Sequence, residues 1–268
     1  MELILFSHDV GYAAAAVAAG VAHVVVDWEW RGKAERQCGW DTQINRATPQ
    51  DVQAMRAAIG DRVICRVNNT PPDRDDECRA AVDHGACEVW LPMVRDVREV
   101  EGCLRAIDGR ARLGVMVETR QAMGLGRALA QLPLAHAYVG LHDYHIDGGS
   151  AQLFDPIVDG TLDRFRQEYS GALGVAGITR PCGGHPIPQR LLLAAMARLG
   201  CSFGVARRGF LADIPVAGLN AGIDEIHDEL DRLVARPAME IEGDHAALAR
   251  LLGHRVDALS IPVVACAS

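Results

Sequence analysis

The sequence has few aromatic residues and little basic charge. Only 5% of its 268 residues are aromatic, and 27 Lys and Arg face 35 Asp and Glu, which gives a net charge of −8 with His neutral. An acidic chain without a basic run is a poor candidate for binding nucleic acid or an anionic membrane through general electrostatics. We therefore expect no nucleic-acid partner and no membrane partner.

Long apolar runs are also lacking. The longest, residues 13–26, is mostly alanine, is interrupted by Gly20 and His23, and is shorter than the ~20 residues that a bilayer core requires. The N-terminus has no basic stretch ahead of an apolar one, so we expect no secretory signal. At 49% hydrophobic residues the chain is not of the disordered type, and a globular cytoplasmic protein is expected.

The eight cysteines include no Cys-x-x-Cys pair, which argues against a zinc ribbon and against a thioredoxin-type redox motif. Several of them, such as Cys65 and Cys201, lie inside apolar runs. We interpret them as reduced, buried thiols, in agreement with a cytoplasmic location.

The chain does contain a regular alternation of short apolar segments and longer helical ones. Eight segments are short, rich in Val, Ile and Leu, and apolar on both faces, which is typical of strands buried in a parallel sheet. The predicted strands span 2–6, 23–27, 62–67, 87–91, 112–118, 137–141, 173–179 and 201–206.

Predicted helices lie between these strands, at 48–59, 73–84, 97–107, 120–131 and 187–199. Eight strands, each followed by a helix or loop, indicate an α/β protein with a closed (β/α)8 TIM barrel. A doubly wound open sheet is the alternative, but no Gly-x-Gly-x-x-Gly follows the first strand.

A single domain is expected, with a TIM-barrel catalytic part over 1–210 and a C-terminal helical extension over 211–268. Helices are predicted at 218–235 and, with an Asp at the N-cap, at 244–252. The first places five large apolar residues on one face: Leu219, Ile223, Ile226, Leu230 and Leu233. Because a monomer rarely leaves such a patch exposed, we expect the extension to pack at an oligomer interface.

Charged residues end or follow four of the predicted strands. Asp27 ends the second and Glu29 follows it, Arg66 lies at the end of the third, Glu118 ends the fifth, and Asp143 follows the sixth. The active site of a TIM barrel gathers at these carboxyl ends. Two carboxylates on neighbouring strands, Glu118 and Asp143, suit Mg²⁺, which takes one or two carboxylates plus water and substrate oxygens. Arg66 offers a planar fork that matches a substrate carboxylate.

A metal beside a carboxylate-binding arginine suits a 2-oxo acid, which chelates through its carboxylate and its keto oxygen. The metal would act as a Lewis acid and hold the enolate that forms when a C–C bond breaks. Arg66 could instead bridge strands to Asp27 or Glu118 without any ligand.

Five motifs occur in order over roughly residues 20 to 210: Asp27-Trp28-Glu29, Arg66-Val67-Asn68, Leu91-Pro92-Met93-Val94, Val117-Glu118-Thr119 and Gly140-Leu141-His142-Asp143. This set resembles the HpcH/HpaI aldolase and citrate lyase β-subunit family. Members of that family have a TIM barrel that binds pyruvate, oxaloacetate or related enols through a divalent metal, and they assemble as trimers or hexamers.

The resemblance implies a site residue by residue. Glu118 and Asp143 would be the ligands of Mg²⁺ (or Mn²⁺ or Co²⁺), and Arg66 the clamp on the substrate. Asp27 and Glu29 would orient water, metal or substrate. The substrate would also contact the fifth motif, at Gly140, Leu141 and His142. We therefore predict a metal-dependent carbon–carbon lyase or aldolase, assembled as a homo-oligomer.

The stretch after the second strand departs from this pattern. Aldolases of the HpaI type carry a His just after the acid, where this chain has Trp30-Arg31-Gly32-Lys33. A citrate-lyase-like acyl-CoA or acyl-thioester lyase is therefore an alternative, and it would need basic side chains at the mouth, for which Lys33, Arg207 and Arg208 are the candidates. The two arginines could also pair with the acidic tail helix. A non-catalytic protein that binds a small acid is a further alternative.

Overall fold

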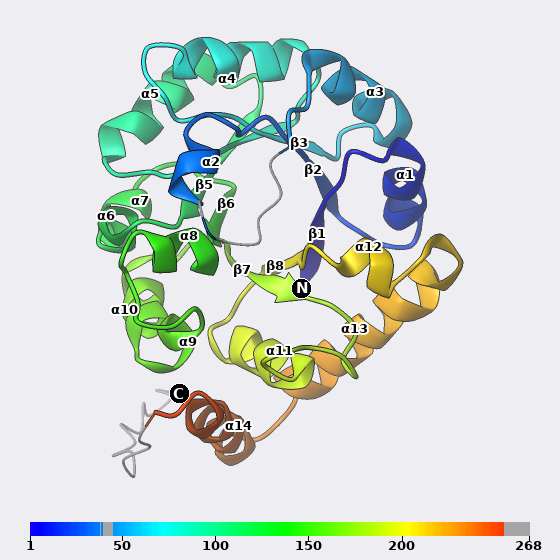
Figure 1. The fold of residues 1–268 in the computed structure, drawn as a ribbon, viewed down its shortest axis with the longest axis vertical. Coiled ribbons are helices and arrows are strands. Elements are labelled where there is room, and N and C mark those ends of the chain that lie inside the picture. The colour runs from blue at the N-terminus through cyan, green and yellow to red at the C-terminus, as the bar shows by residue number, and fades with distance from the viewer. Residues whose placement is uncertain (38, 40–44, 255–268) are drawn as a thin grey trace, which may run out of the picture.

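The computed structural model describes residues 1–37, 39 and 45–254. Eight parallel strands close into a barrel in chain order, so the predicted (β/α)8 fold is confirmed (Figure 1). Each predicted strand overlaps an observed one. The strands are β1 (Glu2–Phe6), β2 (His23–Asp27), β3 (Val63–Arg66), β4 (Glu88–Leu91), β5 (Arg112–Val117), β6 (His136–Val139), β7 (Leu173–Ile178) and β8 (Phe203–Ala206).

The C-terminal boundary predicted for the sixth strand, residue 141, is wrong. β6 ends at Val139, and Leu141 begins the short helix α8 (Leu141–Ile146). His142 and Asp143 therefore lie in the first turn of a helix at the barrel mouth. Gly140, between the two elements, makes this turn against the side chain of Glu118.

Helices surround the barrel (Figure 1). Thr48 caps the N-terminus of α3 (Pro49–Ile59) through a capping box with Asp51. The predicted helix over 120–131 is two short helices, because the first ends at Gly124. The described helices that precede β8 are α1 (Val10–Ala18), α2 (Lys33–Arg36), α3 (Pro49–Ile59), α4 (Arg74–Asp83), α5 (Val97–Ile107), α6 (Arg120–Met123), α7 (Gly126–Leu129), α8, α9 (Asp155–Val158), α10 (Thr161–Glu168) and α11 (Gln189–Arg198). No helix in the described ranges has the length and apolar character needed to cross a membrane.

The barrel interior is filled by large side chains. Trp90 stacks on Tyr138 with ring centroids 5.3 Å apart and meets Phe203 from the opposite side of the barrel. Two glycines leave the room for these rings: a Cβ at Gly114 would lie 2.5 Å from Trp90, and one at Gly174 would lie 2.3 Å from Phe203. The barrel interior is thus a packed core, and a cavity opens above it, at the carboxyl ends of the strands.

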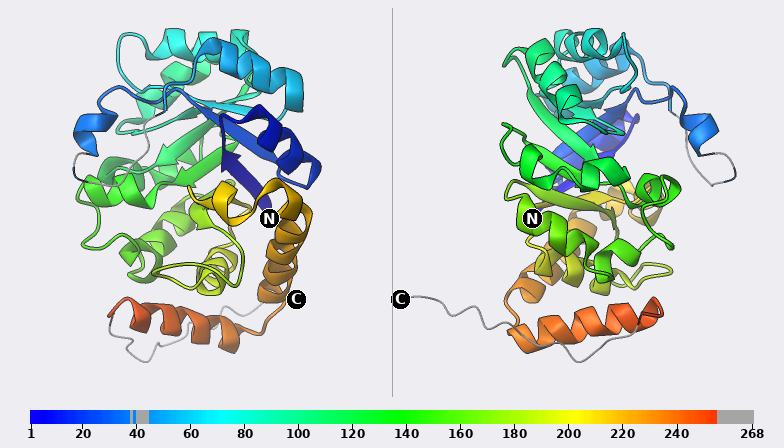
Figure 2. Two further views of the ribbon diagram at one scale, coloured as in Figure 1. Left: turned by 45° about the vertical axis from the view of Figure 1, so that its right-hand side comes forward. Right: turned by 90° about the vertical axis from the view of Figure 1, so that its left-hand side faces the viewer.

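After β8 come α12 (Phe210–Asp213), α13 (Leu219–Val234) and α14 (Ala238–Leu251), the last two along one side of the barrel (Figure 2). The apolar face of α13 is buried within the same chain, where α13 packs on α11 and α1. That face therefore does not require the partner subunit that the sequence led us to expect. The oligomeric state itself stays a prediction.

The start predicted for the last helix, residue 244, is wrong. α14 begins at Ala238 after Pro237, six residues ahead of Asp244, which therefore does not cap it. Asp244 instead pairs with Arg190 and Arg236, and these ion pairs tie α14 to α11 and to the end of α13.

Candidate active site

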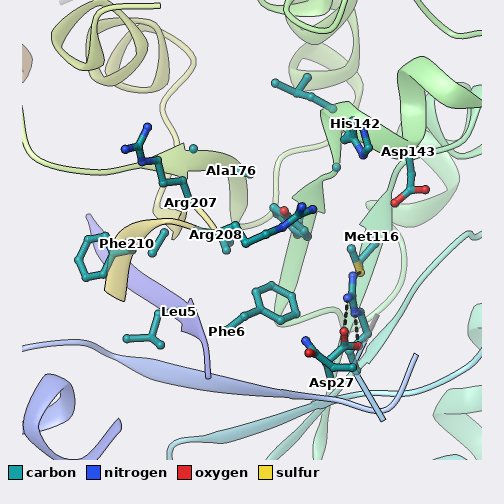
Figure 3. Close-up of a pocket in the computed structure, with 18 of the residues that line it drawn as sticks. Leu5, Phe6, Asp27, Met116, His142, Asp143, Ala176, Arg207, Arg208 and Phe210 are labelled. Carbon is teal, nitrogen blue, oxygen red and sulfur yellow. Dashed lines mark hydrogen bonds and ion pairs between the residues drawn. The ribbon is translucent and has the colours of Figure 1, made fainter. Parts of the chain in front are cut away.

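A cavity of about 470 Å³ opens at the carboxyl ends of the strands (Figure 3). Its volume lies within the range of ~300–1,000 Å³ that is typical of small-molecule sites. Of the eight site residues predicted from the sequence, Glu29 is buried beside the cavity. The other seven line it: Asp27, Arg66, Glu118, Gly140, Leu141, His142 and Asp143.

Arg66 and Asp27 form a buried pair between β3 and β2 (Figure 3). Arg66 Nε donates to Asp27 Oδ1 at 2.8 Å, and Nη2 donates to Oδ2 at 2.6 Å. Burial alone would raise the pKa of Asp27, but Arg66 and Lys33 outweigh it and hold that pKa at about 2. The guanidinium fork expected to clamp a substrate thus has two of its nitrogens on Asp27.

Three cationic side chains surround the carboxylate of Glu29. Arg36 Nη2 donates to Oε1 at 2.6 Å, while Arg66 Nη1 and Lys33 Nζ lie 3.2 and 3.5 Å from Oε2. Neither of the last two contacts has hydrogen-bond geometry, so the buried Oε2 accepts no hydrogen bond. Three cations therefore balance the charge of Glu29, but its buried Oε2 is an unused acceptor beside the cavity.

The segment after β2 bends over the barrel mouth and carries α2 (Figure 1). Asn68, from the predicted second motif, holds this bend: its Oδ1 accepts from the backbone N–H groups of Trp30 and Arg31 at 3.0 and 2.9 Å. Its Nδ2 donates to the carbonyl of Trp28 at 3.0 Å. Asn68 therefore positions the segment that leads into α2 and does not line the cavity.

Two residues at the mouth were missed from the sequence. Arg36 Nε donates to Asp143 Oδ1 at 2.9 Å, and Gln37 Nε2 lies 3.0 Å from both oxygens of Asp143. Lys33, Arg36 and Gln37 are spaced at i, i+3 and i+4, which puts them on one helical face. That spacing was the only signal in the sequence that could have found them.

The surroundings shift the pKa values of Glu118 and Asp143 in opposite directions. Burial raises the pKa of Glu118 to about 8, and the charges of Asp143 and Glu29 add to the effect. Asp143 is also buried, but Arg36 and Gln37 bring its pKa below the ordinary value. Near neutral pH Glu118 is therefore largely protonated, whereas Asp143 is ionised.

The position of Glu118 depends on backbone groups around it. Its Oε1 accepts the N–H of Met93 at 2.9 Å, from the predicted third motif. Its Oε2 lies against Gly140, where an added Cβ would come within 2.5 Å. Gly140 therefore serves the site by having no side chain, which lets Glu118 lie across it.

A hard divalent cation fits the donor chemistry of this pair. Two carboxylates are a normal protein share for Mg²⁺, and a cation beside Glu118 would favour the ionised form that burial and the charges of Asp143 and Glu29 disfavour. Among residues 1–37, 39 and 45–254, no group of three or more His, Cys, Asp or Glu side chains is arranged as a metal site. An ion at this position would take Glu118 and Asp143 alone from the protein, and Asp143 would have to exchange its contacts with α2.

The opposite half of the cavity is lined by β1, β7, β8 and α12, with Leu5, Phe6, Ala176 and Phe210 as an apolar wall (Figure 3). Arg207 is turned away and pairs with Asp213 of α12 through contacts of 2.7 and 2.9 Å, not with the tail helix. Arg208 extends toward the centre of the cavity (Figure 3). Burial lowers the pKa of His142, and the charge of Arg208 acts in the same direction.

The chain matches no family model and none of the curated proteins. Solved structures are similar in fold. A citrate lyase from Burkholderia xenovorans LB400 is 15% identical over 96% of this chain and 94% of its own, with a TM-score of 0.55. The citrate synthase SbnG is 16% identical over 86% and 94%, with a TM-score of 0.56.

A third structure, 3-hexulose-6-phosphate synthase from Salmonella typhimurium, is 16% identical over 87% of this chain and 100% of its own, with a TM-score of 0.58. At these identities the likeness extends to the fold. The chain is a (β/α)8 barrel of the kind that those proteins share.

Proposed function

We propose that this protein is a carbon–carbon lyase or aldolase that depends on a divalent metal and forms or uses the enolate of pyruvate or a related 2-oxo acid. The observation that carries the proposal is the buried pair Glu118 and Asp143 in the cavity that also holds Arg66. The names of the similar barrels, a citrate lyase and two synthases, support chemistry of this general type.

In this proposal Glu118 and Asp143 hold the ion, and Mg²⁺, Mn²⁺ or Co²⁺, when bound, supplies a Lewis acid for the keto oxygen and the enolate. To hold the ion, Asp143 would exchange its hydrogen bonds from Arg36 and Gln37 for the metal. Met93 and Gly140 keep Glu118 in position meanwhile.

Arg66 binds the substrate carboxylate. Asp27 engages Nε and one hydrogen of Nη2, and Nη1 donates one hydrogen to Met116 Sδ at 3.8 Å, so the donors that remain are the second hydrogens of Nη1 and Nη2. Asp27 thereby fixes the plane of the guanidinium before substrate arrives, which reduces the entropy lost on binding. Glu29 Oε2 is buried beside the cavity and accepts no hydrogen bond, so a water that entered next to it would donate one to it.

The second half of the cavity receives the other fragment of the reaction. A three-carbon acid fills only part of about 470 Å³. The apolar wall and Arg208 suit a short chain that ends in an anion. A CoA thioester would need basic side chains at the mouth to bind its phosphates. Of the three candidates, Lys33 is buried and Arg207 is paired with Asp213. We therefore favour a small substrate over a CoA thioester.

Calorimetry with Mg²⁺ and oxalate, which mimics the enolate of pyruvate, tests the proposal. We expect oxalate to bind only with the metal, and Glu118→Gln and Asp143→Asn each to abolish this binding while the fold is retained, because rim residues contribute little to the core. Glu240→Gln on the exposed side of α14 removes the same charge far from the cavity and serves as the control.

Undiminished binding in both variants, or no effect of the metal on the wild type, would contradict the lyase mechanism. Binding without turnover of any 2-oxo acid would favour a protein that senses a small acid.

A further inference from the structure

The chain contains a single lysine. Of its 27 basic residues 26 are arginine, and the exception is Lys33. Elsewhere the protein uses arginine for surface ion pairs, for helix contacts and for the buried pair with Asp27. A lysine at one position only indicates a requirement there that arginine does not meet.

Lys33 lies inside the cavity. Its side chain is 5% exposed, and Nζ is 3.2 Å from Asp27 Oδ2 and 3.5 Å from Glu29 Oε2. A structural ion pair with two carboxylates does not explain the choice, because a guanidinium makes more hydrogen bonds to such a pair. Arg66 demonstrates this on the same Asp27.

The chemical difference between the two side chains is the removable proton. An arginine keeps its proton at any working pH, whereas the ammonium of a lysine exchanges one. We propose that Lys33 transfers the proton at the reacting carbon of the 2-oxo acid. This inference rests on the proposed function.

The step balances within the site. In the cleavage direction, one N–H bond of the Lys33 ammonium breaks and the proton goes to the terminal carbon of the enolate. The enolate electron pair forms the new C–H bond, the carbonyl is restored, and the amine left behind regains a proton from water. In the reverse direction the neutral amine removes the same proton.

The groups that face Lys33 come from three strand ends. They are Asp27 and Glu29 after β2, Arg66 at the end of β3, and His8 after β1, whose pKa is lowered mainly by burial and also by the charges of Arg66 and Lys33. The two acids hold the Lys33 amine at the cavity wall, with Nζ 3.2 Å from Asp27 Oδ2 and 3.5 Å from Glu29 Oε2.

Exchange of the pyruvate methyl hydrogens for deuterium in D₂O, followed by proton NMR with Mg²⁺ present, measures this step without a second substrate. We expect Lys33→Arg to slow the exchange by about 10²–10⁴-fold, the usual contribution of a general acid–base. Oxalate affinity should stay within about threefold of the wild type, less than 1 kcal/mol. Arg98→Lys, on the exposed side of α5, makes the reverse exchange as a control.

The outcomes separate the two proposals. A wild type that does not bind oxalate with Mg²⁺ refutes the proposed function. A wild type that binds oxalate but exchanges no hydrogen, or a Lys33→Arg variant that exchanges normally, overturns the role of Lys33 alone. A covalent adduct with pyruvate, trapped by borohydride and seen as a mass increase at Lys33, would also overturn it, in favour of an imine.

If the Lys33→Arg variant fails to fold, the proposal can still be tested on the wild-type chain. Reductive methylation with ¹³C-formaldehyde labels only Lys33 and the terminal amine, so one side-chain signal reports on Lys33. We expect that signal to titrate with the same midpoint as the exchange rate of the methylated protein, and to shift when Mg²⁺ and oxalate are added. An exchange rate that does not follow this titration contradicts the proposal.

Discussion

Arg36 Nε and Asp143 Oδ1 lie 2.9 Å apart and join α2 to α8 across the barrel mouth. The contact occupies one of the two carboxylates that we assign to the metal. Gln37 engages the same carboxylate at 3.0 Å. α2 and a cation are thus alternative partners of Asp143.

Removing this arginine should strengthen metal binding. In Arg36→Gln, Asp143 loses a hydrogen bond from a charged donor, and the mouth loses a positive charge. We expect Mg²⁺ to bind about tenfold more tightly, or ~1.4 kcal/mol, by calorimetry. Arg98→Gln, which removes an exposed arginine, should leave the affinity unchanged. Weaker binding in Arg36→Gln would mean that Arg36 does not compete with the ion.

The raised pKa of Glu118 predicts how the free energy of unfolding depends on pH when a chelator keeps the protein free of metal. Between its ordinary value of 4.5 and about 8 in the folded protein, the native state holds a proton that the unfolded chain has lost. This carboxyl therefore lowers the free energy of unfolding as pH rises, by at most ~1.4 kcal/mol per pH unit. Glu118→Gln lacks the effect.

Urea unfolding at pH 5, 7 and 8.5 checks the sign. The stability of Glu118→Gln relative to the wild type should increase steadily across this series. A relative stability that is constant or falls would show that Glu118 is not held in its protonated form.

Arg66→Lys should weaken binding of the acid. The ammonium keeps the charge but loses the planar set of donors that serves Asp27 on one edge and the substrate on the other. We expect a loss of about 1.5–3 kcal/mol in oxalate affinity by calorimetry, the value of a hydrogen bond to a charged group. Equal affinity in the two proteins would assign Arg66 to the bridge with Asp27 alone.

Arg208 should recognise an anion on the second fragment. 2-Oxoglutarate and 2-oxopentanoate share the 2-oxo acid end and the chain length, and only the first has a distal carboxylate. We expect the wild type to prefer 2-oxoglutarate and Arg208→Gln to lose most of this preference, while affinity for 2-oxopentanoate is kept. The same modest affinity for both acids in the wild type would remove Arg208 from substrate recognition.

The face of α13 should stabilise the single chain. Ile226 is fully buried, so Ile226→Ala should cost about 2–5 kcal/mol of unfolding free energy, through lost burial and the cavity left behind. Asn220→Ala on the exposed side of α13 is the control. A variant that changes only the assembly size in light scattering, at unchanged stability, would restore the oligomer role predicted for this face.

The sequence by itself determined the barrel and much of its rim. Strands such as His23–Asp27 and Val63–Arg66 are apolar on both faces, and only a sheet covered on both sides buries such a pattern. Parallel strands that close on themselves bring all their carboxyl ends together. Asp27, Arg66 and Glu118 could therefore be placed in one cavity from their positions at strand ends.

The tertiary structure decided how those side chains are used. Gln37 and Asp143 are 106 residues apart, and no local pattern predicts that they meet. Whether Arg66 faces a ligand or Asp27, and how far the pKa of Glu118 rises, depend on burial and on charges from four strands. The spacing of its apolar residues predicted the apolar face of α13. Whether a neighbouring helix or a second chain covers that face depends on how the helices pack around the barrel, which the sequence does not show.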